Sequence, residues 1–370
     1  MAQYHGIIFA YGSNGDLGEL VRTRTAASLP FCGRYRLIDF ALSSLMNAGI
    51  HNVGVIMQRD YQSLLDHLGS GVDWDMGRHH GGLRILPPFG LPEYHKGDYT
   101  GTIEALNAVS TYINDIKAEN VILMQGDLAG NLDLAAAMQS HEESGAEITA
   151  ICTKDTPEYL HHRYVVSSDG FARKMIFNQT EAGEGVASLE AYIVKKELLI
   201  SAMSSCAAAN RYHFHRDVIA AYLQNGGAVN VYVHDGYAKR LRNIETYFGS
   251  SMDMLKPAVM AQMFPAARPV RTKSREDVST YYGESAKVKN SLVSDGCIIE
   301  GKLTNCLVFP GVRVEKGAEL CNCIIMRGSK IGENVILKNV ITDKYVEISA
   351  FQTLVGSEKL PIVVPKRSRI

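Results

Sequence analysis

The sequence has no long apolar run. No stretch reaches the roughly eighteen consecutive apolar residues that a membrane-spanning helix needs. The apolar start at residues 4–10 is too short for a signal peptide, and it lacks both a basic segment before it and a small-residue cleavage site after it. We therefore expect a cytoplasmic protein with no membrane segment.

The sequence also lacks an excess of charge of either sign. Its 38 Lys and Arg residues face 39 Asp and Glu residues, which leaves a formal net charge of −1 at pH 7. Such a chain has no electrostatic field that would gather nucleic acid or an anionic membrane. With 46% apolar and 21% charged residues it is typical of a globular protein, so we expect small molecules and other proteins as its partners.

Cysteine is scarce, and its spacing favours no cross-link. The seven cysteines are scattered and lie mostly in apolar runs, which indicates reduced thiols. Cys321 and Cys323 are separated by one residue, whereas a zinc knuckle has a longer gap and a second pair nearby. We interpret both as buried strand thiols rather than metal ligands.

The length of 370 residues predicts two domains. Up to about residue 250, short β-rich runs alternate with helical ones, which is typical of a parallel or mixed sheet with crossover helices. The spacing of apolar residues predicts strands at 6–10, 53–57 and 121–125, and helices at 36–48, 61–68, 102–112 and 134–141. Prolines and a charged run at 271–277 then indicate a connector.

The last part of the chain repeats itself. Asn290, Asn305, Asn322 and Asn339 each open a similar unit, at intervals of 15, 17 and 17 residues. Within each unit, apolar residues recur about every sixth position with glycines between them, which predicts a β-solenoid. An antiparallel β-sandwich is the alternative. Because solenoid coils stack and leave their flanks free, we expect this domain to serve assembly and regulation.

Four stretches of the chain resemble one family, the glucose-1-phosphate adenylyltransferases or ADP-glucose pyrophosphorylases. Residues 30–50, which begin Pro-Phe-Cys-Gly-Arg-Tyr-Arg-Leu-Ile-Asp-Phe, resemble the family's segment after its first loop. Residues 81–88 are similar to the stretch before its nucleotide-contacting Gly-Thr, here Gly101-Thr102. Gln125-Gly126-Asp127 resembles the strand end with the metal-binding aspartate, and residues 290–348 resemble the family's left-handed β-helix.

The resemblance implies the fold and the division of the chain. The fold class is α/β, with a Rossmann-like, GT-A-like nucleotidyltransferase domain followed by a left-handed parallel β-helix domain. We place the first domain at residues 1–255, a connector at 256–283 and the β-helix, as an assembly and regulatory domain, at 284–370.

The family's reaction makes ADP-glucose and pyrophosphate from ATP and glucose 1-phosphate. In phosphoryl transfer a protein positions the reactants and neutralises charge with Mg²⁺ and with Arg or Lys side chains. Two of the family's cations are missing here, because Asp16 replaces the arginine of the first loop and Ala26 replaces the lysine of the following Arg-Ala-Lys-Pro segment. The residues that could still hold an adenine nucleotide are Gly12, Gly15, Gln58, Gly101 and Thr102.

The metal site implied by the resemblance is altered as well. Asp127 stands where the family holds Mg²⁺, but Arg240 takes the place of the second metal-binding aspartate. Two like charges about 4 Å apart repel by roughly 4 kcal/mol at an effective dielectric constant of about 20, enough to slow turnover roughly a thousandfold. We expect no intact catalytic residue, no productively bound Mg²⁺ and no other required cofactor. For Asp127, capping of the next helix is the alternative.

The sugar-phosphate site has lost its lysine. Where the family has Phe-x-Glu-Lys-Pro, this chain has Phe177 followed by Asn, Gln179, Thr180 and Glu. Gln179 and Thr180 are remnants of that site, and Glu190 puts a carboxylate where the sugar would approach. The exchanged charges at Asp16 and Arg240 also suggest that these two residues pair across the vacated site; independent, solvated side chains are the alternative.

These departures resemble the GlgD-type subunits of the family, which assemble with a catalytic GlgC-type subunit. We therefore expect a subunit of glycogen biosynthesis that is inactive or weakly active alone and modulates a GlgC-type paralogue in a heterotetramer. A self-sufficient sugar-phosphate nucleotidyltransferase and a protein that only senses a sugar-phosphate effector are the alternatives.

An effector site has no motif of its own in the sequence. The family binds sugar phosphates or related metabolites between its two domains, and arginine grips phosphate groups in a bidentate manner. Candidates for an anionic site that takes an adenine nucleotide or a sugar phosphate are Arg22, Arg24, Arg34, Arg36, Arg163 and Arg216, with solvated surface residues as the alternative. The histidines at 79–80, 161–162, 213 and 215 show no metal-ligand pattern and are expected to be surface or structural residues.

Overall fold

The computed structural model describes residues 3–11, 16–78, 81–87, 99–155, 157, 161–179 and 183–370. The chain divides into two compact units, each made of separate stretches. The first unit comprises Met1–Gly12, Ile38–Arg240 and Pro265–Arg271, and the second comprises Ser13–Leu37, Leu241–Phe264 and Thr272–Ile370. The domain boundaries at 255 and 284 divide the sequence in another way and stay a prediction.

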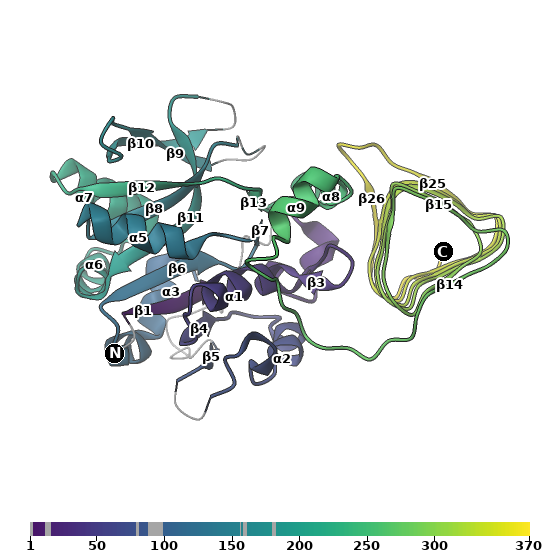
Figure 1. Cartoon of the computed structure of the whole chain (residues 1–370), viewed down its shortest axis with the longest axis horizontal. Coiled ribbons are helices and arrows are strands. Elements are labelled where there is room, and N and C mark those ends of the chain that lie inside the picture. Colours follow the sequence, from purple (N-terminus) through teal and green to yellow (C-terminus); the bar gives the residue numbers. More distant parts are fainter. Residues whose placement is uncertain are drawn as a thin grey trace. The chain divides into compact units, whose positions relative to one another are not determined.

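The first unit is built on one nine-stranded mixed sheet (Figure 1). Its strands lie in the order β10-β9-β11-β6-β1-β4-β5, and β8 pairs with both β11 and β12. The neighbours of β1 are parallel to it, whereas β11 is antiparallel to β6 and β8. The strands are β1 (Tyr4–Phe9), β4 (Val53–Ile56), β5 (Leu83–Leu86), β6 (Asn120–Gln125), β8 (Ile148–Thr153), β9 (His161–Val166), β10 (Ala172–Gln179), β11 (Val186–Lys195) and β12 (Val229–His234).

Helices connect these strands much as the apolar spacing predicts. The predicted helix at 102–112 is two helices, because Val109 leaves the helical conformation with φ −116° and ψ 26°. The helices are α1 (Leu37–Asn47), α2 (Gln62–Leu68), α3 (Thr102–Ala108), α4 (Ser110–Asp115), α5 (Leu134–Ser144), α6 (Lys196–Ala208) and α7 (Ala220–Gln224), which a π-helical turn (Phe214–Ile219) precedes.

The core of the first unit lies on both faces of the central strands. Every residue of β4 and β6 is buried, as expected for parallel strands that helices cover on both sides. Leu106 of α3, Leu199 of α6 and Phe214 of the π-helical turn pack into one apolar cluster with β1 and β6. This packing fixes the strand ends from which the site residues project.

Each unit also contains one short ribbon of two paired strands. β7 (Leu128–Gly130) and β13 (Ala238–Arg240) pair antiparallel, with Arg240 opposite Leu128. In the second unit, β2 (Pro30–Phe31) and β3 (Tyr35–Arg36) form a tight hairpin. The β7–β13 ribbon brings residue 240 next to the end of β6, although more than a hundred residues separate them.

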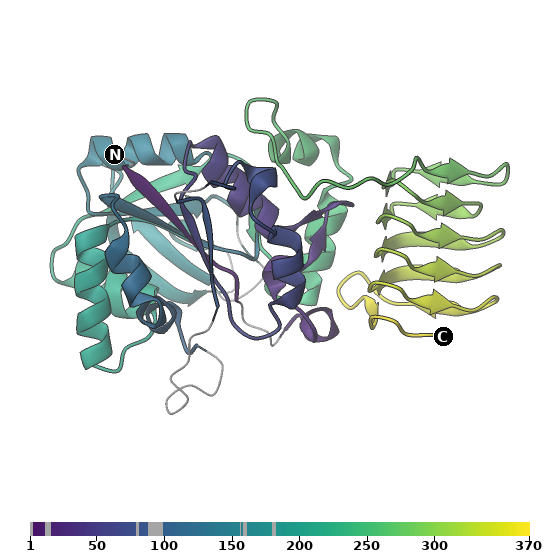
Figure 2. The same cartoon turned by 90° about the horizontal axis from the view of Figure 1, so that it is seen from below.

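The last stretch of the second unit is a parallel β-solenoid. Figure 1 looks down its axis and shows a triangular cross-section, and Figure 2 shows the coils stacked. Strands of successive coils pair in parallel, which overturns the alternative of an antiparallel sandwich. The strands are β14 (Tyr281–Tyr282), β15 (Lys287–Lys289), β16 (Leu292–Val293), β17 (Ile298–Ile299), β18 (Lys302–Thr304), β19 (Leu307–Val308), β20 (Arg313–Val314), β21 (Glu319–Ile325), β22 (Lys330–Ile331), β23 (Ile336–Thr342), β24 (Glu347–Ile348), β25 (Thr353–Val355) and β26 (Ile362–Val364).

Each coil contributes equivalent residues to a continuous core. Ile299, Val314, Ile331 and Ile348 stack in register along one sheet of the solenoid and are buried. Cys323 lies buried in the same core, as predicted, whereas Cys321 is only half-buried. The sequence repeat therefore corresponds to one inward-facing residue per strand and coil.

The repeated asparagines form a ladder along one edge of the solenoid. Asn290, Asn305, Asn322 and Asn339 all have positive φ angles, between 44° and 53°, which asparagine tolerates better than most residues. The side-chain amides of the first three each donate a hydrogen bond to the next asparagine, at 2.8, 3.1 and 3.2 Å, and that of Asn339 donates to the carbonyl of Gly356 at 3.0 Å. The ladder explains why an asparagine opens each unit of the repeat.

Two helices of the second unit precede the solenoid. α8 (Ile244–Asp253) begins at Asn243, which forms a capping box with Thr246. α9 (Pro257–Met263) has its proline at the first helical position and lies inside the stretch predicted as a connector. Among the described residues, no helix combines the length and the apolar character that crossing a membrane requires.

Candidate functional site

The carboxyl ends of β1, β4 and β6 lie side by side. Phe9 is in register with Ile56 on one side and with Gln125 on the other. Tyr11, Gln58 and Asp127 each follow these strand ends by two residues, so they share one edge of the sheet. Ligands of open α/β sheets bind at this edge.

Asp127 is held by Arg240. The guanidinium Nε donates to Oδ1 and Nη2 donates to Oδ2, both at 2.8 Å, and both residues are buried. This is a bidentate, charge-assisted pair, the strongest kind of side-chain hydrogen bond. The alternative role of Asp127 as a helix cap is wrong, because Asp133 caps α5 by accepting from the amide of Ala136.

Glu190 is the second carboxylate beside Arg240. Its Oε1 lies 2.6 Å from Nη1 of the guanidinium. Glu190 has a φ of 52° and sits where the register of β11 shifts between Ser188 and Ala191, which is a β-bulge. Its amide donates to the hydroxyl of Ser188, and the bulge turns its side chain toward Arg240. We call Arg240, Asp127 and Glu190 the Arg240 cluster.

The Arg240 cluster does not fit a divalent cation while Arg240 stays in place. The positive guanidinium lies within 2.8 Å of the oxygens that a metal ion would need, and two cations so close repel. Within the described ranges, no group of three or more His, Cys, Asp or Glu side chains is placed to hold a metal ion.

The two positions at which the family's cations are replaced belong to the second unit. Asp16 is exposed, and its backbone carbonyl accepts from the amide of Ile244 at 3.2 Å. Ala26 is buried and opens a 3₁₀ turn. Arg240 contacts two carboxylates of its own unit, so the pairing of Asp16 with Arg240 stays a prediction.

The nucleotide-binding candidates keep one unused donor. Gln58 is 5% exposed, and its Nε2 has no hydrogen-bond partner in the part of the chain that the structure describes. A buried amide without a partner costs free energy, which a ligand acceptor would recover. Gly101 precedes α3, where a Cβ would lie 2.2 Å from the carbonyl oxygen of Tyr212, so only glycine fits before Thr102. Gly12 and Gly15 lie outside the described residues.

Two tyrosines stand at the same edge. Tyr11 follows β1, and its ring meets that of Tyr99 edge to face at 5.2 Å between centroids. Burial is the main reason why the pKa of Tyr11 is raised, and the charges of Glu104 and Glu190 add to it. Two uncharged aromatic side chains therefore lie beside the candidates for nucleotide binding. The sequence analysis did not predict their role.

The sugar-phosphate side carries a stack of histidines. The rings of His162 and His215 lie 4.1 Å apart at 28°, and Phe177 meets His162 edge to face at 5.3 Å. Burial lowers the pKa of His215, Glu190 opposes that shift, and Arg240 reinforces it. Gln179 donates to the carbonyl of Phe177 in its own strand, and Thr180 lies outside the described residues. The spacing of these histidines gave no signal for the stack.

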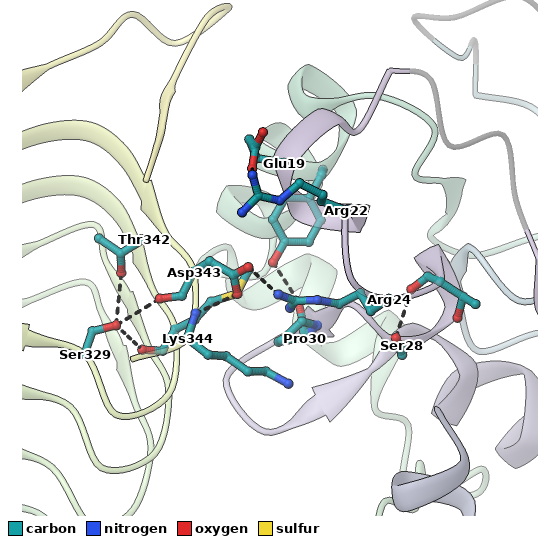
Figure 3. Close-up of polar contacts among 12 residues, drawn as sticks. Glu19, Arg22, Arg24, Ser28, Pro30, Ser329, Thr342, Asp343 and Lys344 are labelled. Atoms are coloured by element: carbon teal, nitrogen blue, oxygen red, sulfur yellow. Dashed lines mark hydrogen bonds and ion pairs between the residues drawn. The ribbon is translucent and has the colours of Figure 1, made fainter. Parts of the chain in front are cut away.

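A second charged cluster lies in the second unit (Figure 3). Arg24 and Asp343 form a buried ion pair through Nη2 and Oδ2, and the Asp343 carboxylate also accepts from the amide of Lys344 at 2.6 Å. Burial, followed by the charges of Arg36 and Arg24, lowers the pKa of Lys344 to about 7. Burial and Arg24 also lower the pKa of Lys366. We call Arg24, Arg36, Asp343, Lys344 and Lys366 the Lys344 cluster; its cations outnumber its single carboxylate.

The remaining arginine candidates are engaged locally or exposed. Arg22 pairs with Glu19, and Arg216 pairs with Asp217. Arg163 is buried and donates to the backbone carbonyls of Glu184 and Gly185. Arg34 is exposed in the turn after β2. Of the six candidates, only Arg24 and Arg36 converge on one site.

The chain matches two family models. Residues 5–237 match the model described as nucleotidyl transferase, and residues 275–360 match the model described as GlmU-like, C-terminal hexapeptide. Together they confirm a nucleotidyltransferase α/β domain followed by a hexapeptide parallel β region.

Curated relatives match over nearly the whole chain. The glycogen biosynthesis protein GlgD of Bacillus subtilis (strain 168) is 30% identical over 364 residues, which cover 98% of this chain and 96% of the relative. The glucose-1-phosphate adenylyltransferases of Bacillus mycoides (strain KBAB4) and Bacillus anthracis are each 28% identical, over 95% of this chain and 94% of theirs. The chain therefore belongs to the glucose-1-phosphate adenylyltransferase, or ADP-glucose pyrophosphorylase, family.

Proposed function

We propose that this chain is a GlgD-type subunit of glucose-1-phosphate adenylyltransferase in glycogen biosynthesis, inactive or weakly active alone. The observation that supports this most strongly is the bidentate hold of Arg240 on Asp127, because it uses the carboxylate that would bind the metal of the reaction.

The physical argument rests on charge. Transfer of a phosphoryl group needs Mg²⁺ and basic side chains to neutralise the charge that develops on the phosphate oxygens. In this chain Asp16 and Ala26 stand where the family has an arginine and a lysine, and Glu190 adds a carboxylate near the sugar site. Each change works against the binding of anionic reactants.

The partner we propose is a GlgC-type catalytic paralogue that makes ADP-glucose and pyrophosphate from ATP and glucose 1-phosphate. The name of the Bacillus subtilis relative supports a GlgD-type role. By resemblance to the family, the assembly is a heterotetramer in which this chain is the pseudoenzyme and changes the turnover of its partner.

The Lys344 cluster is the effector site that we propose for this subunit. Arg24, Arg36, Lys344 and Lys366 place positive charge around one buried carboxylate. Clustered Arg and Lys side chains suit an anionic metabolite such as a sugar phosphate. The unused amide of Gln58 supports, as a separate candidate function, that an adenine nucleotide still binds without reacting.

The test is ADP-glucose synthesis by the purified chain, by the catalytic paralogue and by the co-expressed pair. A silent chain, together with a pair that exceeds the paralogue or changes its response to sugar phosphates, supports the proposal. Turnover by the chain alone at the rate of the paralogue would instead support a self-sufficient nucleotidyltransferase. A chain that never co-purifies with the paralogue but binds a sugar phosphate would support a sensor.

A further inference from the structure

The Arg240 cluster has the composition of a metal site with a guanidinium in place of the metal. We propose that Arg240 is a built-in replacement for a divalent cation, and that Asp127 and Glu190 form a latent pair of ligands for an ion such as Mg²⁺ or Mn²⁺. This inference goes beyond the proposed function and does not depend on it, because metal affinity is measured on the chain alone.

The first argument is the geometry of the two carboxylates. Asp127 follows β6, Glu190 lies in β11, and these strands are neighbours in the sheet. One guanidinium reaches both, because Nε and Nη2 bind Asp127 while Nη1 faces Glu190. Two carboxylates that approach one cation from neighbouring strands become candidate ligands for another cation once the first is removed.

The second argument is the backbone of Glu190. A residue with a Cβ rarely adopts a φ of 52°, and such conformations persist where the surrounding structure holds them. Here the bulge of β11 and the hydrogen bond from its amide to Ser188 fix the backbone of Glu190, so the strand position that carries its carboxylate does not depend on Arg240.

The third argument is charge in a buried place. The side chains of Asp127, Arg240 and Glu190 are 6%, 5% and 15% exposed. Buried carboxylates need a compensating cation, so removal of Arg240 would leave two negative charges with a strong demand for one. Oxygen ligands suit hard cations, and Mg²⁺ is commonly bound through one or two carboxylates with water in the other positions. The space vacated by the arginine side chain would admit that water.

The experiment measures Mn²⁺ binding to the full-length chain and to Arg240→Ala, by the loss of the free Mn²⁺ signal in electron paramagnetic resonance. We expect no stoichiometric binding by the unaltered chain and one Mn²⁺ per chain for Arg240→Ala, with a rise in its melting temperature of about 5 °C at saturating metal. The double variant Arg240→Ala/Glu190→Gln should lose the ion, and Arg240→Lys should not gain it.

A matched control uses the other buried arginine–carboxylate pair. Arg24→Ala also removes the arginine partner of a buried carboxylate, that of Asp343. This variant exposes only one carboxylate, and the neighbouring Lys344 is basic, so the variant should gain no Mn²⁺ site. If Arg240→Ala does not fold, Arg240→Gln serves for the same measurement. The proposal is overturned if the unaltered chain binds Mn²⁺ in a manner that Asp127→Asn abolishes. It is equally overturned if a folded Arg240→Ala or Arg240→Gln binds none.

Discussion

The two charged clusters of this protein combine basic and acidic side chains in opposite proportions. In the Arg240 cluster, one guanidinium serves two carboxylates, and each of its hydrogen bonds to Asp127 measures 2.8 Å. In the Lys344 cluster, two arginines and two lysines share one carboxylate, that of Asp343. The first cluster is therefore negative overall and the second is positive.

The difference shows how the surplus charge decides what a buried ion pair can do. A cluster with a surplus carboxylate repels an anionic nucleotide, and its cation already occupies the place of a metal. A cluster with surplus cations, one of them with a pKa of about 7, attracts an anion. We interpret the first as the closed former catalytic centre and the second as the site through which the subunit responds to metabolites.

The largest effect is expected from restoring the family's residue types at the three replaced positions, one of which is Arg240. The triple change Asp16→Arg, Ala26→Lys and Arg240→Asp restores the residue types of the family at these positions. ADP-glucose synthesis by the chain alone should rise about a thousandfold, since relief of one like-charge contact is of that order. Pyrophosphate release measures it, with Arg240→Lys as the control. A folded triple variant that stays silent would contradict the assignment of these positions.

Breaking the Arg240 cluster should cost stability. Arg240→Ala leaves Asp127 and Glu190 buried without a counter-charge, so the free energy of unfolding should fall by about 3–5 kcal/mol. Urea denaturation followed by circular dichroism measures the change. Arg240→Lys, which keeps the charge, should lose clearly less. Equal losses in the two variants would mean that packing rather than charge holds the cluster together.

The Lys344 cluster should make stability depend on pH. The pKa of Lys344 falls from 10.5 to about 7 on folding, so between these values the unfolded chain binds more protons and stability rises with pH. Below about pH 7, Lys344 is charged in the folded protein and lowers the free energy of unfolding by its full amount. Above that pH the folded protein loses this charge, so the free energy of unfolding should rise by about 2 kcal/mol between roughly pH 7 and 8.5. Lys344→Met should remove this part of the rise. An unchanged pH dependence in that variant would place the pKa of Lys344 near its ordinary value.

The same lysine should make anion binding depend on pH. A bound phosphate group favours the charged form of Lys344, so the affinity for a sugar phosphate should fall about tenfold per pH unit above roughly pH 7. Isothermal titration in buffers of different ionisation enthalpy detects the coupled proton uptake. Lys330→Met is the matched control, because Lys330 is an exposed solenoid lysine that pairs with Glu347. Binding that does not change with pH would remove Lys344 from the site.

The smallest effect is expected away from both clusters, in the asparagine ladder. Asn322→Ala loses two ladder hydrogen bonds and places alanine at a φ of 52°, which should cost about 1–2 kcal/mol. Asn322→Gly keeps the backbone conformation and should cost less. Melting temperatures compare the variants. Equal losses in the two variants would show that the ladder stabilises the coil through its side-chain amides alone, and a greater loss in the glycine variant would contradict the prediction.

The sequence predicted the solenoid well because one residue type, asparagine, recurs at the same position of each repeat. Asn305 and Asn322 mark the same corner of successive coils, and a local backbone angle fixes that choice. The strands of the first unit were predictable for a similar reason, since parallel strands covered on both faces are continuous apolar runs. The break at Val109 was not, because no glycine or proline marks it.

The site was predictable only in part. Replacement of a metal-binding aspartate by Arg240 indicated a changed centre, but its hold on Asp127 depends on the β7–β13 ribbon, which pairs residues far apart in the sequence. The contact of Glu190 with Arg240 depends on a β-bulge that no local sequence pattern predicts. The convergence of Arg24 with Lys344 was hidden for the same reason, because more than three hundred residues separate them.

The place of Arg240 at the end of β13 has a further consequence. Its backbone is paired with β7, so its charge is carried on a fixed ribbon rather than on a loop. In a working nucleotidyltransferase, the local field changes each time a metal ion and a nucleotide arrive or leave. A tethered guanidinium neither arrives nor leaves, so in the mixed assembly proposed here the charge at this position of the subunit stays the same whether cellular magnesium is abundant or scarce.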